Sequence, residues 1–465
     1  MVLTNTIIAC ALALFTASTD AQLVEKKYSS YATDQQNILR HLGGTGPFVE
    51  AVGWGIPTET PYQCTIDQAH LFMRHGERYA TKGSDKGLRT LYDRLKNTAQ
   101  NITAVGPLSF VGDESFTFFE EASWHDQETY YGPYAGTGDL FHMGNILRER
   151  YAHLVNSSKT LPIFTAGQKR VFDSAVNFAN GFTFNQYAQN YTMVVLPENQ
   201  DSGLNSLTNT NSCPNFDGDY EGAYANQTLQ YSTIEAARLN ALSPGFNITA
   251  ADVYNMCGYC AFELDVRGSS PFCDALSQDA MIGFGYDKDI STYYSDGPGY
   301  NMSFVSGSAY ANATLALLKD NKTEENTYFS FSHDNDLLRY VTFLGFFDID
   351  GDLPVDHVDF YKFYSVSEII PMGGRLITER LSCYNETSKE DDKFVRFLLN
   401  DQVIPFPNCS SGPGYSCPLD SYAEIIESQL LDFPELCAQN TSTPLYTSFY
   451  WDWESGKYPT EYTSN

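Results

Sequence analysis

Two short polar segments, far apart in the chain, carry residue types that could bind and transfer a phosphoryl group. Residues 74–78 read RHGER and residues 332–335 read SHDN. Guanidinium groups hold phosphoryl oxygens in a fork and keep their charge at any working pH. In the first segment Arg74 and Arg78 flank His75, so they could hold a phosphoryl group in line with an imidazole nitrogen. The pattern predicts a site for phosphate monoesters.

The same segments supply the groups that such a reaction needs. Positive charges nearby disfavour an imidazolium, so His75 could remain a free nucleophile in mild acid. Expulsion of an alkoxide needs a proton, and Asp334 is a candidate general acid. We therefore predict two catalytic residues and four phosphate ligands: His75 and Asp334, and Arg74, Arg78, Arg170 and His333.

Each of these residues also has a structural interpretation. A single histidine after a strand is more often a packed side chain than a nucleophile, and an arginine that opens a helix is usually solvated or ion-paired. Asp334 could simply cap the helix that follows it, and His333 could orient a neighbour. The two arginines beside His75 and the separate His-Asp pair at a similar position favour the functional interpretation.

Three stretches of the chain have the form strand, sharp turn, helix, and their turns carry basic residues and histidines. The strands are expected at 68–73, 161–165 and 327–331. After the second strand, apolar residues recur every three or four positions from Val171 to Phe182, which predicts a helix with one apolar face. Ligands of open α/β sheets bind beyond the carboxyl ends of the strands. We expect the three turns to meet there.

The stretches between these units are expected to form a second structural part. Residues 185–300 are rich in Asn, Gly, Tyr and Cys and contain helical patterns. We interpret them, with 90–134, as a mainly helical cap stapled by disulfides and inserted into an α/β core. The expected division is a signal peptide at 1–21, core segments at 22–89, 135–184 and 301–465, and cap segments at 90–134 and 185–300.

The charge and composition narrow the classes of partner. The 465 residues include 57 Asp and Glu against 28 Lys and Arg, a formal net charge of −29, with 42% hydrophobic residues. This is a globular chain, and its charge argues against nucleic acid or an anionic membrane as a partner. With a sequence pI of about 4.5, acid conditions would relieve the repulsion of an anionic substrate.

The N-terminal residues predict export. Residues 7–15 form an apolar run of the length of a signal-peptide core, followed by small and polar residues. Cleavage after Ala21 is preferred and cleavage after Ala17 is the alternative. No other stretch approaches twenty apolar residues, so we expect a secreted protein that is extracellular, periplasmic or in the cell wall.

The cysteines and glycosylation motifs agree with export. Without Cys10, nine cysteines remain, which predicts four disulfides and one free thiol in an oxidising compartment. Cys257 and Cys260 form a CxxC pair, but no second pair or nearby histidine completes a zinc site, and the disulfide interpretation is favoured. Asn-x-Ser/Thr motifs occur at Asn101, Asn156, Asn190, Asn226, Asn247, Asn301, Asn312, Asn321, Asn385, Asn408 and Asn440.

Other patterns are given no chemical role. Residues 348–352 suggest a calcium loop, but the glycine and the final glutamate that such a loop needs are missing. His70 is expected to be buried and hydrogen-bonded. The remaining histidines have no partner at ligand spacing and are interpreted as structural or surface residues: His41, His125, His142, His153 and His357.

The two main motifs together resemble the histidine acid phosphatases, particularly the yeast secreted acid phosphatases and phytases. RHGER is followed by Tyr79, and the sequences QAH at 68–70, KRV at 169–171 and LRERY at 147–151 strengthen the likeness. The resemblance spans Asp34 to about Cys437. The family usually has proline where this chain has Ala80, which concerns the rigidity of the loop more than its chemistry.

The resemblance implies a phosphoglycerate-mutase-like α/β core with an inserted, mainly helical cap domain and no metal or other cofactor. His75 would be phosphorylated, Asp334 would protonate the leaving group, and the four other site residues would bind phosphate. The implied disulfides are Cys64 with Cys383, Cys213 with Cys437, Cys409 with Cys417, and Cys273 with Cys257 or Cys260.

The expected function is therefore that of a secreted acid phosphatase acting through a phosphohistidine. Its substrate is either inositol hexakisphosphate or phosphate esters broadly. Two alternatives are a metal-dependent phosphatase, whose ligand clusters the sequence lacks, and a catalytically inactive wall or binding glycoprotein on the same fold. We expect no nucleic-acid or membrane partner, and a homo-oligomer is left open.

Overall fold

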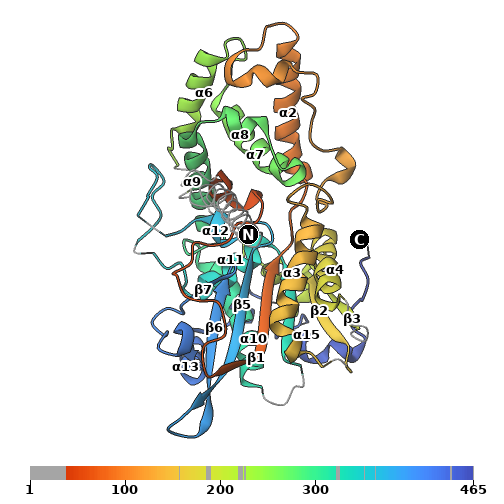
Figure 1. The fold of residues 1–465 in the computed structure, drawn as a ribbon, viewed down its shortest axis with the longest axis vertical. Coiled ribbons are helices and arrows are strands. Elements are labelled where there is room, and N and C mark those ends of the chain that lie inside the picture. Colours follow the sequence, from red (N-terminus) through yellow and green to blue (C-terminus); the bar gives the residue numbers. More distant parts are fainter. Residues whose placement is uncertain are drawn as a thin grey trace, which may run out of the picture.

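The computed structural model describes residues 38–463, without 157, 185–189, 218–223, 225–226, 321–324, 350, 362 and 440–441. The expected signal peptide and the motifs at Asn226, Asn321 and Asn440 lie outside the described residues. A sheet with helices on both faces forms one part of the molecule, and a group of helices forms the other, above it in Figure 1. The prediction of an α/β core with helices beside it is confirmed.

Four strands form the parallel half of the sheet. In spatial order they are β3 (Tyr191–Leu196), β2 (Leu161–Ala166), β4 (Thr327–Ser332) and β1 (Cys64–Arg74). Every residue of β2 and β4 is buried. Strands buried on both faces read as nearly continuous apolar runs and need helices on both sides. The expected strands at 68–73, 161–165 and 327–331 correspond to β1, β2 and β4.

Four strands form the antiparallel half. β5 (Arg375–Asn385) pairs with β1, β6 (Glu390–Leu399) pairs with β5, and β7 (Gln402–Ile404) and β8 (Cys417–Pro418) both pair with β6. Short turns connect β5, β6 and β7 because antiparallel neighbours need no crossover.

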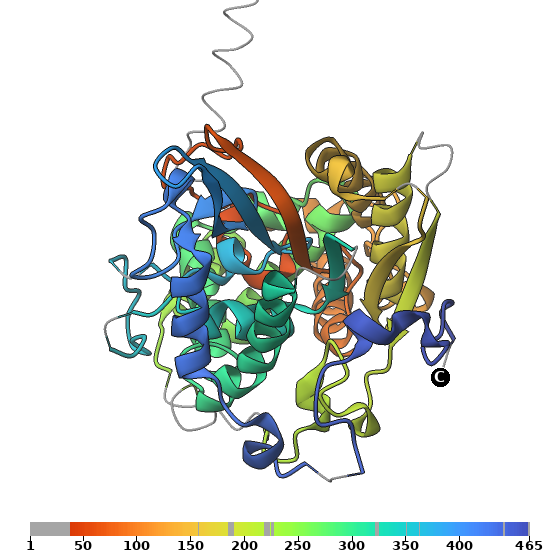
Figure 2. The same ribbon diagram turned by 90° about the horizontal axis from the view of Figure 1, so that it is seen from below.

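Helices cover the two faces of the sheet. α3 (Gly136–Tyr151) and α4 (Lys169–Thr183) lie together on one face, and α10 (Asn301–Lys319) and α11 (Asp334–Phe343) lie on the other (Figure 2). α4 follows the predicted apolar face, with Val171, Phe178 and Phe182 buried. These residues belong to the main hydrophobic core that surrounds the sheet.

The helical part has a hydrophobic core of its own. It contains α2 (Lys82–Ala99), α6 (Tyr231–Leu242), α7 (Ala250–Arg267) and α8 (Pro271–Ala275). α7 begins at a capping box in which Thr249 and Asp252 satisfy each other's backbone N–H, and it ends at Gly268 with φ 74°.

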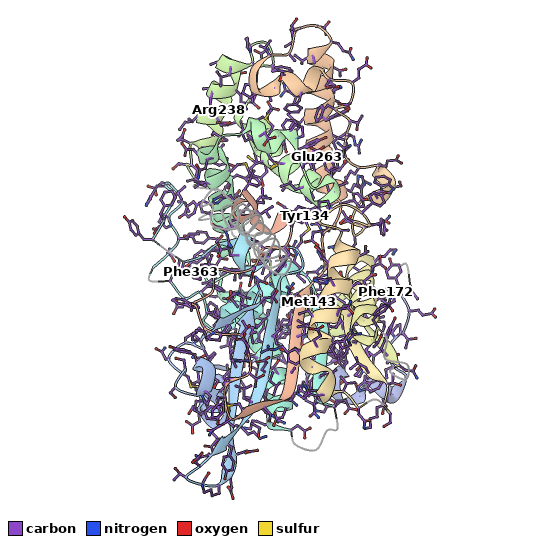
Figure 3. All side chains as sticks on the ribbon, viewed as in Figure 1. Tyr134, Met143, Phe172, Arg238, Glu263 and Phe363 are labelled. Atoms are coloured by element: carbon purple, nitrogen blue, oxygen red, sulfur yellow. A yellow bond between two sulfur atoms is a disulfide. The ribbon has the colours of Figure 1, made fainter. Side chains whose placement is uncertain are left out.

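Helix α9 (Gln278–Ser295) connects the two parts, because Phe284 lies in the helical core and Ile290 lies in the main core. Figure 3 shows Arg238 and Glu263 among the upper helices, Met143 and Phe172 beside the sheet, and Tyr134 between the two parts.

Four further α-helices are described, and α13 is the longest of them. They are α12 (Val366–Ile369), α13 (Leu419–Gln429), α14 (Phe433–Leu436) and α15 (Phe449–Asp452). The 3-10 helices are η1 (Ile38–His41), η2 (Gly43–Thr45), η3 (Gly106–Gly112), η4 (Ala122–Trp124), η5 (Ala152–Leu154), η6 (Gln200–Ser202), η7 (Asn209–Ser212), η8 (Pro413–Tyr415) and η9 (Trp453–Ser455). Among the residues described, no helix combines the length and apolar character needed to cross a bilayer.

Two elements lie across the expected core and cap boundaries. β3 falls within 185–300 but is a strand of the central sheet, because it pairs with β2 along its whole length. α2 begins within 22–89 but packs with the helices of the upper part through Leu88, Leu91 and Leu95. The division into core and cap domains stays a prediction.

Four disulfides are present and correspond to the implied framework. They join Cys64 to Cys383, Cys213 to Cys437, Cys409 to Cys417, and Cys260 to Cys273. The choice that the sequence left open is therefore Cys260, and Cys257 is a free, buried thiol. Because Cys260 is bonded to Cys273, the CxxC sequence forms neither a redox pair nor a zinc site.

Most of the described glycosylation motifs are accessible. Asn385 is partly exposed, and the exposed asparagines are Asn101, Asn156, Asn190, Asn247, Asn301, Asn312 and Asn408. Glycan attachment requires this exposure and stays a prediction.

Candidate active site

The predicted site forms where β1 and β4 end side by side. The two strands are parallel neighbours, and the last residue of each, Arg74 and Ser332, are paired in register. The chain therefore turns at the same level in both strands, and the backbone N–H of His75 donates to the carbonyl of Ser332 at 3.1 Å. The rings of His75 and His333 lie 6.0 Å apart.

The imidazole of His75 is held in one tautomer. Its Nδ1 lies 2.8 Å from the carbonyl oxygen of Gly76. Because a carbonyl oxygen can only accept, Nδ1 carries the proton and Nε2 keeps its lone pair. Burial lowers the pKa of His75 well below its usual value, and the charges of Arg170, Arg74 and Arg78 lower it further. Both effects favour the neutral ring.

The turn after His75 requires glycine. The backbone N–H of Gly76 donates to Glu128 Oε1 at 3.1 Å and to Ser174 Oγ at 3.0 Å. A Cβ on this residue would lie 2.5 Å from Leu140 Cδ2 and 3.0 Å from the carbonyl oxygen of Gly136. The close approach of these neighbours fixes the position of the nucleophile's backbone.

Three arginines surround His75 with incompletely satisfied donors. Arg74 is fully buried and donates from Nη1 to the carbonyls of Gly44 and Ile370, each at 2.6 Å. Its Nε, and the Nε atoms of Arg78 and Arg170, are buried and have no hydrogen-bond acceptor. Buried donors without acceptors are rare and usually mark the place of a ligand or water. The arrangement suits an anion with several oxygens.

The other two arginines are also oriented by neighbouring groups. Arg78 donates from Nη1 to the carbonyl of Tyr79 at 2.9 Å and faces the ring of Phe262, on α7, at 5.7 Å. Burial and the neighbouring guanidinium groups lower its pKa to about 10. Arg170, in the first turn of α4, pairs with Asp126 at 3.4 Å. The contact with Phe262 locates the site at the junction of the two parts of the molecule.

Asp334 is the first residue of α11, and His333 is the N-cap of that helix. The interpretation of Asp334 as a simple N-cap is therefore wrong. Its carboxylate pairs with Arg74 Nη2 at 3.0 Å, and a third of the side chain is exposed. Burial raises its pKa, but Arg74, His333 and Arg78 together outweigh burial and lower the pKa to about 2.

Sequence reasoning missed three carboxylates that surround the site. Glu198 accepts from His333 Nε2 at 3.0 Å and Asp126 pairs with Arg170. Asp265, on α7, is fully buried and neither of its oxygens has a hydrogen-bond partner. Burial and Glu77 raise its pKa well above the usual value, although Arg78 and Arg74 oppose the shift.

The sequence offers a pattern that could have indicated one of these carboxylates but not the other two. Glu198 follows an apolar run, YTMVVL, so the strand-end argument could have found it. Asp126 and Asp265 had no such signal in the sequence.

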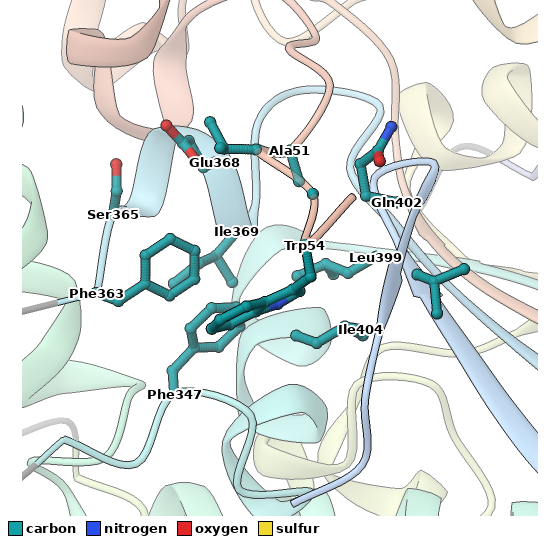
Figure 4. Close-up of a pocket in the computed structure, with 13 residues that line it drawn as sticks. Ala51, Trp54, Phe347, Phe363, Ser365, Glu368, Ile369, Leu399, Gln402 and Ile404 are labelled. Carbon is teal, nitrogen blue, oxygen red and sulfur yellow. The ribbon is translucent and has the colours of Figure 1, made fainter. Parts of the chain in front are cut away.

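Two cavities differ in their relation to the site. One, of about 230 Å³, is lined by Arg170, His333 and Asp334, together with Glu198. The other lies under Trp54 and between Phe347, Phe363 and Ile404, and its walls are mainly apolar (Figure 4). None of the predicted site residues lines the second cavity, so substrate chemistry is assigned to the first.

The remaining histidines have the contacts of structural groups. His70 is buried and its Nε2 lies 3.2 Å from Gln68 Oε1, as predicted. His125 has partners that its sequence position did not reveal, because its Nε2 lies 3.3 Å from Asp85 and 3.6 Å from Glu120.

These three side chains are the one group among the described residues with metal-ligand spacing. Arg89 already donates to both oxygens of Asp85, at 3.0 and 3.1 Å. That carboxylate already forms an ion pair with Arg89, and we assign no metal to the group.

Comparison with known proteins agrees with the geometry. The sequence profile of the histidine phosphatase superfamily (branch 2) matches residues 65–400. The chain is 45% identical to "Acid phosphatase PHO1" of Komagataella pastoris, with 92% of each chain covered. It is 37% identical to "Phytase PHO112" of Candida albicans, again with 92% of each covered.

Solved structures extend the comparison. The structure of the phytase from D. castellii superposes with a TM-score of 0.87 at 36% identity and covers 94% of this chain and 96% of that one. A Bifidobacterium longum multiple inositol polyphosphate phosphatase shares the fold, with a TM-score of 0.61 at 12% identity. The resemblance stated from the two motifs is confirmed: the chain belongs to the histidine phosphatase superfamily, branch 2.

Proposed function

We propose that the protein is an acid phosphatase that hydrolyses phosphate monoesters through a phosphohistidine at His75. One observation carries the proposal: buried donors of Arg74, Arg78 and Arg170 without acceptors surround a neutral imidazole whose Nε2 is free. The relatives named acid phosphatase and phytase support the reaction class. They do not support the alternative of an inactive glycoprotein.

The first step transfers the phosphoryl group to the enzyme. Nε2 of His75 forms a bond to phosphorus while the bond between phosphorus and the ester oxygen breaks. Asp334 gives its proton to that oxygen, so the leaving group departs as an alcohol. The arginines neutralise the charge on the phosphoryl oxygens, which lie between them and the imidazole.

The second step regenerates the enzyme. A water molecule attacks phosphorus and gives a proton to the Asp334 carboxylate, and the bond between nitrogen and phosphorus breaks. Inorganic phosphate leaves, His75 is again neutral, and Asp334 is again protonated. The same residue acts as acid and then as base.

The proton of Asp334 depends on the bound substrate. In the empty site Arg74, His333 and Arg78 hold the pKa of Asp334 at about 2, so the carboxylate is ionised even in acid. A phosphoryl dianion between the arginines offsets their charge, and the pKa of Asp334 then rises. Substrate binding and low pH therefore act together to protonate the general acid.

Export and the substrate's identity are also part of the proposal. Four disulfides and the exposed glycosylation motifs support secretion into an oxidising compartment. Relatives carry the names acid phosphatase and phytase, so esters of simple alcohols and inositol hexakisphosphate are both candidate substrates.

Phosphate release between about pH 3 and pH 8 tests the function, with EDTA present and with an aryl phosphate and inositol hexakisphosphate in parallel. We expect turnover that peaks in acid. Release from both substrates would identify a phytase, and release from the aryl phosphate alone would identify a general acid phosphatase. Absence of release from either substrate would overturn the proposal.

A further inference from the structure

The carboxylate of Glu198 connects two elements of the site. Its Oε2 accepts from His333 Nε2 at 3.0 Å, and its Oε1 accepts from the backbone N–H of Gln168 at 2.8 Å. Gln168 is the N-cap of α4, the helix that carries Arg170, and it has no side-chain cap of its own. One carboxylate therefore fixes the positions of both His333 and the start of α4.

The contact also determines which nitrogen of His333 remains for a substrate. A carboxylate can only accept, so Nε2 of His333 donates to Glu198. Nδ1 is then the ring nitrogen left to contact a phosphoryl oxygen. Binding an anion through Nδ1 requires a proton there as well, which makes the ring an imidazolium.

The negative charge of Glu198 beside a site for an anionic substrate would repel the substrate, so we ask what this carboxylate stabilises. The groups that face His333 come from several elements: Glu198 after β3, His75 after β1, Arg170 on α4, and Asp334 and Asp336 on α11. A fourth cation beside three arginines is unfavourable unless an anion is close to it. Glu198, which makes a direct hydrogen bond to the ring, supplies that anion.

The surroundings of Glu198 favour its ionised form. Burial raises its pKa, but the hydrogen bond and charge of His333, the N–H of Gln168 and the charge of Arg170 outweigh burial. Its pKa consequently lies below the usual value. The side chain is 12% exposed, so water screens the pair little.

We propose that Glu198 is a positioning residue that holds His333 as an imidazolium with Nδ1 free for the phosphoryl group, and that aligns Arg170 through the start of α4. The inference rests on the proposed phosphatase function and adds a residue to its machinery. Glu198 does not touch the reacting atoms and acts through its two hydrogen bonds.

Glu198→Gln tests the proposal with little change in shape. The amide has one acceptor oxygen, so it cannot accept from both His333 and Gln168. Losing one hydrogen bond to a charged group predicts a fall in kcat/KM of about 10- to 100-fold. The alkaline limb of the pH profile should also move to lower pH, because the carboxylate that favours imidazolium is gone. Glu198→Asp should recover part of the activity.

Making the Glu198→Gln replacement in a His333→Ala variant separates an effect on the position of His333 from a general structural effect. In His333→Ala, replacing Glu198 by Gln should cause a much smaller further loss than in the wild-type chain. Glu427→Gln is a matched control, because Glu427 pairs with Lys319 on the surface and should leave the pH profile unchanged. The unfolding temperatures of all variants verify that each is folded.

The outcomes are distinct. A shifted pH profile together with a loss that His333→Ala masks would support the positioning role. An unchanged profile in Glu198→Gln, or an equal loss in both backgrounds, would overturn it. If the wild-type chain itself releases no phosphate, the proposed function fails and the role of Glu198 in it fails with it.

Discussion

The charged residues around His75 determine its pKa and the affinity of the empty site for an anion. Three guanidinium groups lie close enough to lower the pKa of His75, and two of them lower the pKa of Arg78 as well. Asp334 offsets part of this charge by pairing with Arg74 at 3.0 Å. A dianionic phosphoryl group can relieve the same repulsion, so binding and catalysis depend on the same residues.

We expect His75→Ala to abolish phosphate release. No other described group at the site combines a free imidazole lone pair with the three arginines, so the phosphoenzyme cannot form. The protein should still fold, because the side chain makes one hydrogen bond, to Gly76. Assays of turnover and thermal unfolding, with the exposed His357→Ala as control, would test this. Near-normal turnover would exclude His75 as the nucleophile.

Replacement of Asp334 by Asn should affect alkyl phosphates far more than aryl phosphates. An alkoxide is a poor leaving group and needs a proton, whereas a phenolate leaves with little assistance. General acid catalysis typically contributes about 10²- to 10⁴-fold, and the loss for an alkyl ester should fall in that range. Parallel kinetics on glycerol phosphate and nitrophenyl phosphate provide the measurement. Equal losses on both substrates would remove Asp334 from the acid role.

At the scale of elements, the turn after β1 is held by a second segment of the chain. The N–H of Tyr79 donates to Gln127 and the N–H of Asp126 donates to Ala80, at 2.9 and 3.2 Å. The N–H of Ala80 donates to Glu120 Oε2 at 2.8 Å. Where the family usually has proline, this chain therefore uses hydrogen bonds to fix the loop that carries Arg78.

Ala80→Pro, although it introduces the residue usual in the family, should destabilise this chain. Proline has no N–H, so Glu120 would lose its backbone donor in a buried position. An unsatisfied buried group costs about 1–3 kcal/mol in the free energy of unfolding. Ala80→Gly keeps the N–H and is the matched control. Chemical denaturation would measure the difference; equal or greater stability of the proline variant would show that the hydrogen bond is dispensable.

The elements that the sequence predicted are those whose pattern is local. The apolar runs of β1, β2 and β4 and the apolar face of α4 are legible without knowledge of their partners. β5 and β6 are less legible, because buried charges interrupt their apolar pattern: Glu379 on β5 pairs with Arg396 on β6 at 2.6 Å, and both are buried. β3 was not predicted, because residues 185–300 were assigned to the helical cap; its place in the sheet depends on pairing with β2, which no local pattern encodes.

The same distinction applies to the site. The five site residues of the two motifs, and Arg170, lie at the ends of strands that could be predicted, and the structure brings all six to one edge of the sheet. The carboxylates that lie around them come from distant segments. Asp126 and Asp265 reach the site through loop and helix packing.

For the molecule as a whole, buried carboxyl groups couple stability to pH in two directions. Burial raises the pKa of Glu77, Glu128 and Asp289 to about 8. Their folded pKa lies above the unfolded value of about 4, so the stability they contribute is full below pH 4 and is lost as the pH rises toward 8. Glu379 has a lowered pKa because Arg396 and Arg150 outweigh burial, so its contribution is lost as the pH falls below about 4.

These opposing groups predict greatest stability in mild acid. The unfolding temperature should be higher at pH 5 than at pH 8, and the net charge of −29 at pH 7 acts in the same direction through self-repulsion. Glu128→Gln isolates the buried-group effect, because the amide resembles the protonated acid and can still accept from Gly76. The variant should match the wild type at pH 5 and exceed it at pH 8. An unfolding temperature that rises from pH 5 to pH 8, or a variant that follows the wild type at both values, would contradict this account. If the expected result is obtained, the fold is most stable in mild acid. In the same range His75 is expected to be neutral and Asp334 to hold its proton beside bound phosphate.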